Sequence, residues 1–318
     1  MTDVPYSSDI EAGDVREGHD VLAGEPGIGP GLTCRWPADR APLGFVLFCH
    51  GLGSNGRGYA DLARHWARHG YLVIQPTFAD AVGRVAVHEP ELGLDPGADL
   101  SRWTQMPAVR ARMHEILHAP EHWLERIATA NSVMDKLDSV FDATSGRPGR
   151  HVPGAIAGHS FGAYTAQILA GAEIDLPGGQ ARRFHDDRFS AAILLSAQGR
   201  DQQGLRDGSW DGMDGPVLTV TGTLDQGAKG GDWHWKSEPY DLAPAGRKYL
   251  AVLEDSDHYL GGFADNGIQQ QVPEQREALR QVTLAFLDAH VRGSPVARDW
   301  LAAINDRVGD CRLLFKRK

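Results

Sequence analysis

The chain has 318 residues, of which 42% are hydrophobic and 23% charged, and its 32 basic and 42 acidic side chains give a formal net charge of −10. These proportions are those of an ordinary globular protein and exclude wholesale disorder. The acidic balance, without a basic cluster, excludes nucleic acid as a partner, because nucleic-acid affinity depends on neutralising phosphates. No apolar run approaches the roughly 20 residues that span a bilayer, so we expect no membrane insertion.

The cysteines, Cys34, Cys49 and Cys311, are odd in number and far apart in the sequence. Such spacing argues against a disulfide framework and indicates a reducing compartment. The first residues, MTDVP, lack the basic and then apolar pattern of a signal peptide. We therefore expect a cytoplasmic protein.

Short apolar segments rich in branched side chains alternate with helical patterns along the chain. Continuous apolarity over a short run is typical of a strand covered on both faces. The segments that fit this pattern are 43–49, 71–75, 152–157, 191–196, 217–221 and Lys248–Leu253. The segments with helical periodicity are 58–69, 122–141, 161–172 and 273–291. The alternation predicts an α/β fold with a mostly parallel sheet flanked by helices, in a single domain over residues 1–318.

Two segments, 81–120 and 223–246, interrupt this alternation. Insertions at strand ends are commonly loops or lids, and lids carry apolar residues. The large apolar side chains within these two segments that we expect to line a substrate pocket are Trp103, Met106, Trp233 and Trp235. We expect residues 81–120 to form a cap or lid.

Residues 158–162, GHSFG, match the pattern G-x-S-x-G of a nucleophile elbow. The pattern follows the apolar run VPGAIA and opens the helical run FGAYTAQILAGA, which is the strand–turn–helix context that an elbow needs. The tight turn strains the serine backbone, small flanking residues let strand and helix pack closely, and the helix N-terminus favours an anion. These features predict Ser160 as a nucleophile; the alternative is a glycine-rich turn with an idle serine.

A serine hydroxyl needs a base to take its proton. His258 lies five residues beyond the last predicted strand, in a short loop, and is the expected base. Asp225 lies just beyond the strand 217–221, so we expect its carboxylate to orient the imidazole. Asp201, which follows the strand 191–196, stays open as the alternative acid.

The apolar run FVLFC is followed by the glycine-bearing turn HGLGSN. Acyl transfer creates an oxyanion that fixed backbone N–H groups stabilise. We expect these groups to be the amides of Leu52, in this turn, and Phe161, directly after the serine. His50 is expected to stabilise the turn, and Cys49, at the end of a buried strand, to pack in the core rather than act as the nucleophile. No metal-ligand spacing and no dinucleotide-binding glycine pattern is present, so we expect no metal and no cofactor.

The motifs HGLGSN, GHSFGAYT, TGTLD and SDHYLGG together resemble the α/β-hydrolase superfamily. Within it they are most similar to the bacterial predicted dienelactone hydrolases and to platelet-activating-factor acetylhydrolase-like lipases. The resemblance spans His50 to Gly262 and implies an α/β-hydrolase fold with a sheet of about eight strands. The site residues that it implies are Ser160, Asp225 and His258 as a triad and Leu52 and Phe161 as the oxyanion hole.

The sequence departs from both subfamilies. True dienelactone hydrolases use a cysteine nucleophile, whereas position 160 is serine, so lactone chemistry is not carried over. The acetylhydrolase-like lipases take their acid from an earlier strand end, which keeps Asp201 as an alternative to Asp225.

The sequence thus predicts a serine carboxylesterase that hydrolyses moderately hydrophobic carboxylic esters through an acyl-enzyme on Ser160. Amide hydrolysis or acyl transfer by the same triad is the alternative, and a non-catalytic ligand receptor on a hydrolase fold is a minor one. The expected partner is a small-molecule ester, and a homodimer is left open as the assembly.

Overall fold

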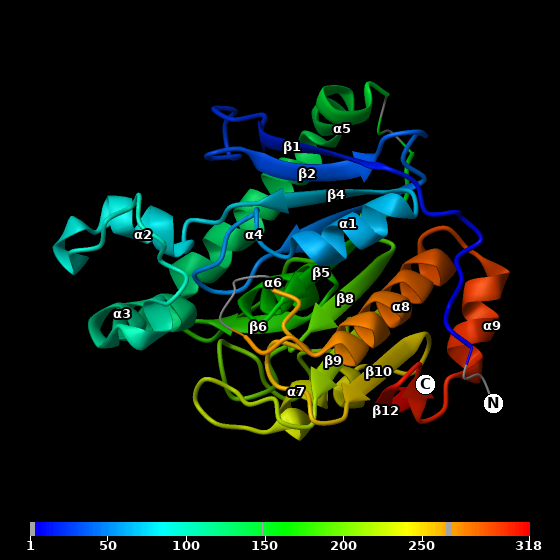
Figure 1. Cartoon of the computed structure of the whole chain (residues 1–318). Coiled ribbons are helices and arrows are strands. Elements are labelled where there is room, and N and C mark those ends of the chain that lie inside the picture. Colours follow the sequence, from blue (N-terminus) through cyan, green and yellow to red (C-terminus); the bar gives the residue numbers. More distant parts are fainter. Residues whose placement is uncertain (1–3, 148, 150, 265–268) are drawn as a thin grey trace.

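The computed structural model describes residues 4–147, 149, 151–264 and 269–318. Within these residues ten strands form one open sheet flanked by helices (Figure 1). In spatial order its strands are β1 (Val15–Val21), β2 (Leu32–Pro37), β4 (Tyr71–Pro76), β3 (Gly44–Cys49), β5 (Gly154–His159), β8 (Ala191–Leu195), β9 (Val217–Gly222), β10 (Lys248–Leu253), β12 (Cys311–Arg317) and β11 (Arg307–Val308). The prediction of an α/β fold with a mostly parallel sheet is confirmed.

The central strands, from β4 through β10 in the spatial order, are parallel and correspond to the six segments predicted from the sequence. Their burial explains why they could be recognised. All residues of β3, β5 and β8 are buried, and each strand is a run of apolar or small residues, with His159 at the end of β5 as the exception.

The edges of the sheet hold strands that the sequence analysis missed, so the expected number of about eight is too low. β1 and β2 join one edge through antiparallel pairing, and β12 and β11 join the other. β1 is exposed or half-buried throughout, and β12 begins with alternating buried and exposed residues. An edge strand with a solvated face lacks the continuous apolarity that identifies a central strand.

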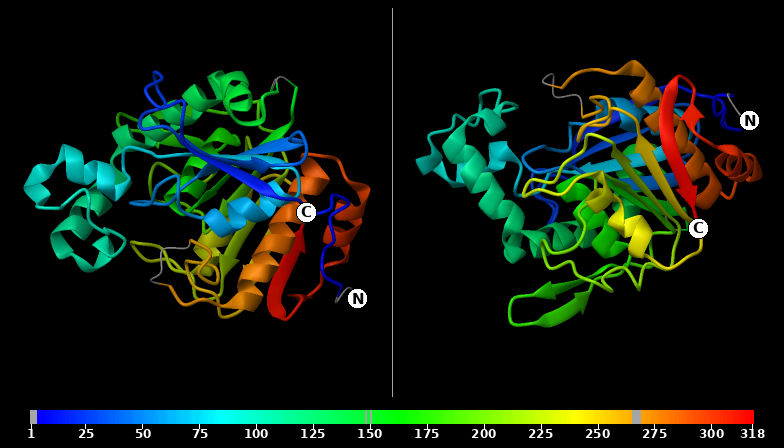
Figure 2. Two further views of the ribbon diagram at one scale, coloured as in Figure 1. Left: turned by 45° about the horizontal axis from the view of Figure 1, so that its top comes forward. Right: turned by 90° about the horizontal axis from the view of Figure 1, so that it is seen from below.

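Helices cover both faces of the sheet (Figures 1 and 2). Val46 and Phe48 of β3 belong to one hydrophobic core, and Phe45 and Leu47 belong to the other. Successive side chains of a strand point to opposite faces, so one apolar strand contributes to both cores. The helices are α1 (Ala60–Arg68) and α8 (Pro273–His290) on the first face, and α4 (Pro120–Asp135), α5 (Leu137–Ser145) and α6 (Phe161–Leu169) on the second.

The segment 122–141, predicted as one helix, lies in two helices. α4 ends and α5 begins on either side of Lys136, whose backbone angles of φ −107° and ψ 17° are not helical. Trp123 and Ile127 of α4 and Phe141 of α5 are nevertheless buried in the same core. The apolar stripe in the sequence therefore marks a buried face that α4 and α5 share, although the helix is interrupted at Lys136.

Residues 81–120, which we call the insertion, project from the body as a lobe beyond β4 (Figure 1). A small hydrophobic cluster of their own, including Val85, Met113 and Ile116, packs this lobe together. Its helical elements are α2 (Val82–His88), η1 (Pro90–Leu92), η2 (Trp103–Gln105) and α3 (Pro107–His118). The lobe is therefore a folded unit of short helices rather than an open loop.

The other elements lie at the periphery of the sheet. α7 packs against β9 and β10, and α9 packs against α8. Their bounds, with those of a separate hairpin, are α7 (Trp233–Leu242), α9 (Pro295–Ala303), β6 (Glu173–Leu176) and β7 (Gln180–Arg183). Among the helices described, none has the combination of length and apolarity that crossing a bilayer requires.

Candidate active site

Ser160 occupies a strained turn between β5 and α6. Its backbone angles are φ 53° and ψ −117°, a combination that costs free energy in a residue with a side chain. The flanking glycines explain how the turn closes: a Cβ at Gly158 would collide with the carbonyl of Gly162, and a Cβ at Gly162 with the carbonyl of Cys49. The Ser160 N–H donates to the carbonyl of Leu195 over 2.9 Å, which ties the turn to β8. The geometry is that of a nucleophile elbow.

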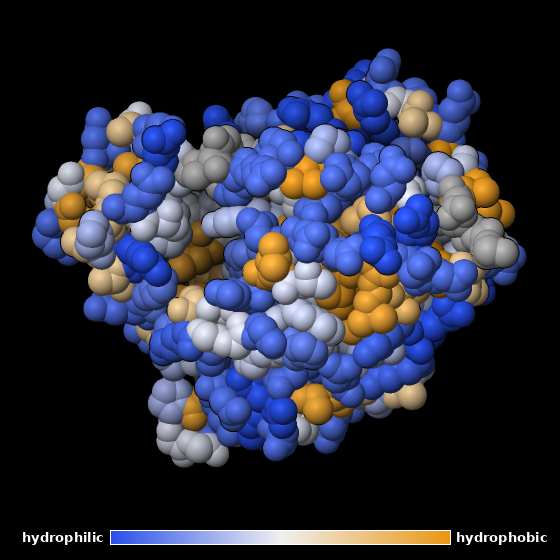
Figure 3. All heavy atoms as spheres, turned by 60° about the horizontal axis from the view of Figure 1, so that its bottom comes forward, coloured by the Kyte–Doolittle hydropathy of each residue, from blue (hydrophilic) through white to orange (hydrophobic). Residues whose placement is uncertain are grey.

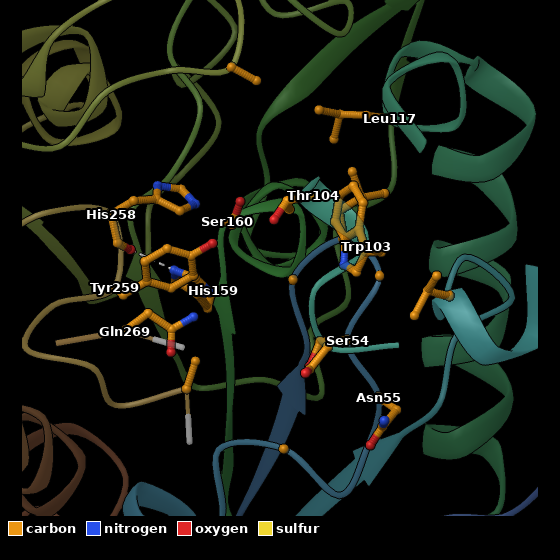
Figure 4. A pocket seen from close by; sticks show the side chains of 18 of the residues that line it. Ser54, Asn55, Trp103, Thr104, Leu117, His159, Ser160, His258, Tyr259 and Gln269 are labelled. Carbon is orange, nitrogen blue, oxygen red and sulfur yellow. Dashed lines mark hydrogen bonds between the residues drawn. The ribbon is translucent and has the colours of Figure 1, made fainter. Parts of the chain in front are cut away.

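His258 and Asp225 come together behind this serine. His258 Nδ1 lies 2.9 Å from Asp225 Oδ1, and the Thr221 hydroxyl donates to Asp225 Oδ2 over 2.8 Å. The carboxylate can only accept, so Nδ1 carries the imidazole proton and Nε2 is left as an acceptor. Figure 4 shows the ring of His258 and the hydroxyl of Ser160 turned toward each other at the pocket. This arrangement can move a proton from Ser160 to His258.

Ser196 is a further partner of His258 that the sequence analysis missed. Its hydroxyl lies 2.7 Å from His258 Nδ1, and it stands directly after β8 with a positive φ of 53°. Asp201, the alternative acid, lies five residues further along and is exposed, and its backbone N–H bonds to the carbonyl of Leu205. The structure thus pairs the imidazole with Asp225 and places a serine, rather than Asp201, at the end of the earlier strand.

Asp225 is negatively charged although its carboxyl group is buried. Its carboxyl group is almost fully buried, which by itself raises the pKa, but the charge and hydrogen bond of His258 and the nearby Lys236 ammonium bring the pKa well below its ordinary value. Burial lowers the pKa of Lys236, which Asp225 partly restores. Lys236 Nζ also lies 3.4 Å from the carbonyl of Ser196. Asp225 therefore stays ionised and can orient the imidazole and stabilise its protonated form.

The turn after β3 is fixed by His50. The Phe78 N–H donates to His50 Nε2 over 3.0 Å, so the ring proton is on Nδ1, which donates to the carbonyl of Gly51 over 2.8 Å. Burial and the nearby Arg126 lower the pKa of His50 to about 4. His50 is neutral and shapes the turn that carries Leu52. Burial also raises the pKa of the Cys49 thiol to about 12, which disfavours the reactive thiolate.

A buried ion pair lies beneath this turn. Arg126 of α4 binds both carboxylate oxygens of Asp80, at 2.9 and 2.6 Å, and donates to the carbonyl of His50 over 2.8 Å. Its guanidinium lies 4.4 Å from the ring centroid of Phe78 and 4.2 Å from that of Phe161. Arg126 thus contacts both the turn that carries Leu52, through the carbonyl of His50, and the ring of Phe161. The signal for it in the sequence is an arginine at an apolar-stripe position, between Trp123 and Ala130.

A second hydrogen-bonded chain joins three loops of the site. His159 Nε2 donates to the carbonyl of His258 over 2.8 Å, so His159 Nδ1 is an acceptor for the Tyr59 hydroxyl at 3.0 Å. The Tyr59 hydroxyl in turn accepts from the Gly51 N–H over 3.1 Å. Burial and the neighbouring His258 lower the pKa of His159 to about 3, so the ring stays neutral. The chain links the turn after β3, the elbow and the histidine loop.

The two expected oxyanion amides come from different segments of the chain. Phe161 is the first residue of α6, so its N–H has no acceptor within the helix. Leu52 lines the same cavity as Ser160. Two backbone N–H groups from different loops can stabilise the oxyanion of an acyl-transfer intermediate.

Ser160 and His258 line a cavity of about 1030 Å³ that opens beside the insertion (Figures 3 and 4). Of the residues expected in the substrate pocket, Trp103 and Trp235 line this cavity. Met106 and Trp233 are not among the described residues that line it. Met106 is 41% exposed, and the Trp233 ring stacks on His234 with their centroids 3.7 Å apart. Trp103 begins η2, and Trp233 and Trp235 lie in α7, where positions two residues apart face different sides of the helix. The sequence analysis treated both segments as loops or lids, so it could not separate these pairs.

A scan against protein-family models and a search of curated proteins found no match. Within the described residues, no group of three or more His, Cys, Asp or Glu side chains is placed to hold a metal ion.

Proposed function

We propose that the chain is a serine hydrolase, specifically a carboxylesterase, of the α/β-hydrolase fold. The observation that carries the proposal is the strained Ser160 facing a histidine whose Nδ1 is bound to the buried Asp225. A nucleophile, a base oriented by a third group and a cavity that reaches both are the features of acyl transfer. The large, mostly parallel sheet with its elbow after a central strand is compatible with that fold.

The proposed reaction uses the site residues in two stages. Ser160 Oγ attacks the ester carbonyl carbon while His258 Nε2 takes its proton, and the Leu52 and Phe161 amides receive the oxyanion. The C–O bond to the alcohol then breaks as His258 returns the proton to the leaving oxygen. A water molecule, deprotonated by His258, attacks the acyl-enzyme and releases the carboxylic acid. Asp225 remains ionised throughout and stabilises the imidazolium.

The three cysteines are buried and unpaired, which supports the proposal of a reducing compartment.

The proposal is tested by covalent labelling. A fluorophosphonate probe should label the wild-type protein on Ser160, located by mass spectrometry of the peptides, and should not label Ser160→Ala. The same preparations should hydrolyse p-nitrophenyl acetate and lose that activity with the substitution. A panel of matched anilides and added alcohols separates ester hydrolysis from amide hydrolysis and acyl transfer. A correctly folded wild-type protein that neither takes the label nor hydrolyses any ester would overturn the proposal in favour of a non-catalytic receptor.

A further inference from the structure

The end of β8 lies between the strand that leads to Ser160 and the strand that leads to Asp225. β5, β8 and β9 are neighbours in the sheet in that order. The peptide group that joins Leu195 to Ser196 is bonded on both sides. Its carbonyl accepts from the Ser160 N–H over 2.9 Å, and its N–H donates to the carbonyl of Val220 over 2.7 Å. The position of Ser196 relative to the elbow and to β9 is therefore fixed by the sheet.

Ser196 has a backbone conformation that serine rarely adopts. Its φ of 53° lies in the left-handed region, which glycine occupies at much lower cost. Its carbonyl lies 3.4 Å from Nζ of Lys236, a buried ammonium whose only hydrogen-bond acceptor in the described part of the chain is that carbonyl. A strained backbone and a buried cation are both costly. A serine kept here at such a cost indicates a use for its hydroxyl group.

The Ser196 hydroxyl is directed at the imidazole of His258. Its Oγ lies 2.7 Å from Nδ1, the nitrogen that also lies 2.9 Å from Asp225 Oδ1. A hydroxyl group can donate or accept, whereas a carboxylate can only accept, so Asp225 keeps the proton on Nδ1 and Ser196 is a second acceptor for it. One N–H can be shared between two acceptors in a three-centre hydrogen bond. The hydroxyl keeps its own hydrogen for the carboxylate, and a hydrogen bond with Ser196 contributes to the lowered pKa of Asp225.

Two acceptors at Nδ1 restrain the imidazole more than one does. With Asp225 alone the ring could tilt about a single hydrogen bond, whereas an acceptor from a second strand limits that tilt. Nε2, on the far side of the ring, is then kept toward Ser160 (Figure 4). When His258 takes the proton of Ser160 it becomes a cation, so both hydrogen bonds at Nδ1 become charge-assisted and stronger. An interaction that strengthens in the transition state lowers the barrier.

We propose that Ser196 is a positioning residue for His258, which shares the Nδ1–H with Asp225 and holds the imidazole toward Ser160. This inference rests on the proposed function and adds a fourth residue to its proton-transfer unit. Ser196 acts through His258, because its side chain is fully buried and cannot contact a substrate in the cavity.

Two substitutions remove the hydroxyl group with different effects on the backbone. Ser196→Ala keeps the strained φ, whereas Ser196→Gly relieves it, so a purely structural role predicts that the glycine variant retains more activity. We expect both variants to lower kcat toward p-nitrophenyl acetate by about tenfold to hundredfold, the loss of one hydrogen bond to a charged group, with little change in KM. Wild-type kcat in folded Ser196→Ala and Ser196→Gly would overturn the inference and leave the esterase proposal intact.

Ser256→Ala is the matched control. The Ser256 hydroxyl is also buried and lies two residues before His258, but it has no hydrogen-bond partner among the described residues. This variant should keep the wild-type kcat. A loss equal to that of Ser196→Ala would overturn the inference, because it would show that any buried hydroxyl near the histidine loop has the same effect.

Proton NMR tests the shared hydrogen independently of turnover. The Nδ1–H of His258, assigned as the downfield resonance that His258→Gln removes, should shift in Ser196→Ala and stay in place in Ser256→Ala. A resonance that does not move in either Ser196 variant would overturn the sharing of the Nδ1–H, whatever the value of kcat. A wild-type protein that neither hydrolyses esters nor takes the fluorophosphonate label would instead overturn the proposed function, and the resonance would still report whether Ser196 binds His258.

Discussion

His159 Nε2 donates a hydrogen bond to the backbone carbonyl of His258 over 2.8 Å. The residue that precedes Ser160 thus holds the loop that carries His258, although His159 and His258 are 99 positions apart. Through the Tyr59 hydroxyl the same ring is joined to Gly51, next to the expected oxyanion amide of Leu52. The relative placement of Ser160, His258 and the turn that carries Leu52 depends on one neutral imidazole and one phenol.

Tyr59→Phe should weaken both folding and catalysis. The change leaves the Gly51 N–H and His159 Nδ1 without their partner, which should lower the free energy of unfolding by about 1–3 kcal/mol. We expect the main effect on kcat, since the hydroxyl that is removed is bonded to Gly51 and His159 and orients the loops that carry them. Tyr249→Phe is the control, because it also removes a hydroxyl bound to a histidine, His290, but on the strand β10. Similar kcat values for the two variants would contradict the linking role of Tyr59.

The triad makes the sharpest kinetic prediction. Ser160→Ala should lower kcat toward p-nitrophenyl acetate by about 10³-fold or more with unchanged circular dichroism. Asp225→Asn should cause a comparable loss, because the imidazole would lose the acceptor that fixes its tautomer. Asp201→Asn, at the alternative acid, should retain nearly full activity. Equal, mild losses in the two aspartate variants would show that the acid is misassigned.

The buried pair beneath the oxyanion loop should be strongly coupled. Arg126→Met leaves the Asp80 carboxylate buried without its partner, which should cost about 3–5 kcal/mol of the free energy of unfolding, measured in urea. The double variant Asp80→Leu, Arg126→Met removes both charges and should be less destabilised than the sum of the single variants. It should still show a reduced kcat, because the carbonyl of His50 has lost its donor. Additive effects on stability would argue against a direct pair.

Stability should fall as the pH is lowered through the range of the buried histidines. The pKa of His50 and of His159 falls from 6.5 to about 4 and about 3 in the folded chain, so below pH 6.5 the unfolded chain binds more protons. The free energy of unfolding then decreases with falling pH, by about 1.4 kcal/mol per pH unit for each histidine. His159→Phe should flatten this dependence in urea titrations between pH 7 and 4.5. An unchanged slope in folded His159→Phe would contradict the burial of a neutral imidazole at this position.

The side of the cavity that Trp103 lines should affect the acyl-chain preference. Trp103→Ala should widen the cavity and shift the optimum of a p-nitrophenyl ester series toward longer acyl chains, because added methylene groups gain buried contact. Met106→Ala, three residues further along but exposed and outside the described lining, is the matched control. An identical chain-length profile for wild type and Trp103→Ala would contradict a role of Trp103 in binding the substrate.

Local patterns were sufficient to predict the central sheet and the residues that the structure brings together at Ser160. Ser160, Asp225 and His258 each stand just beyond a continuous apolar run, so strand recognition also located them. The edge strands were missed because their solvated residues interrupt that apolarity. The count of about eight strands was low for this reason.

The supporting residues of the site could not be predicted because their partners are remote in sequence. Tyr59 is 100 positions from His159, and Asp80 is 46 from Arg126, so no local pattern joins them. Ser196 follows a predicted strand, yet only the folded geometry shows that it reaches His258. Which tryptophans face the cavity likewise depends on how the insertion and α7 fold back.

The Asp80–Arg126 pair affects which part of the chain can vary in sequence without disturbing the site. Asp80 immediately precedes the insertion, and Arg126 follows it by a few residues. The ion pair between them therefore joins the two segments of chain that enter and leave the lobe. Changes in the length or sequence of the lobe need not displace the carbonyl of His50, because the Asp80–Arg126 pair lies outside the lobe. Changes in the lobe can therefore alter the part of the cavity that it lines while the turn that carries His50 keeps its shape.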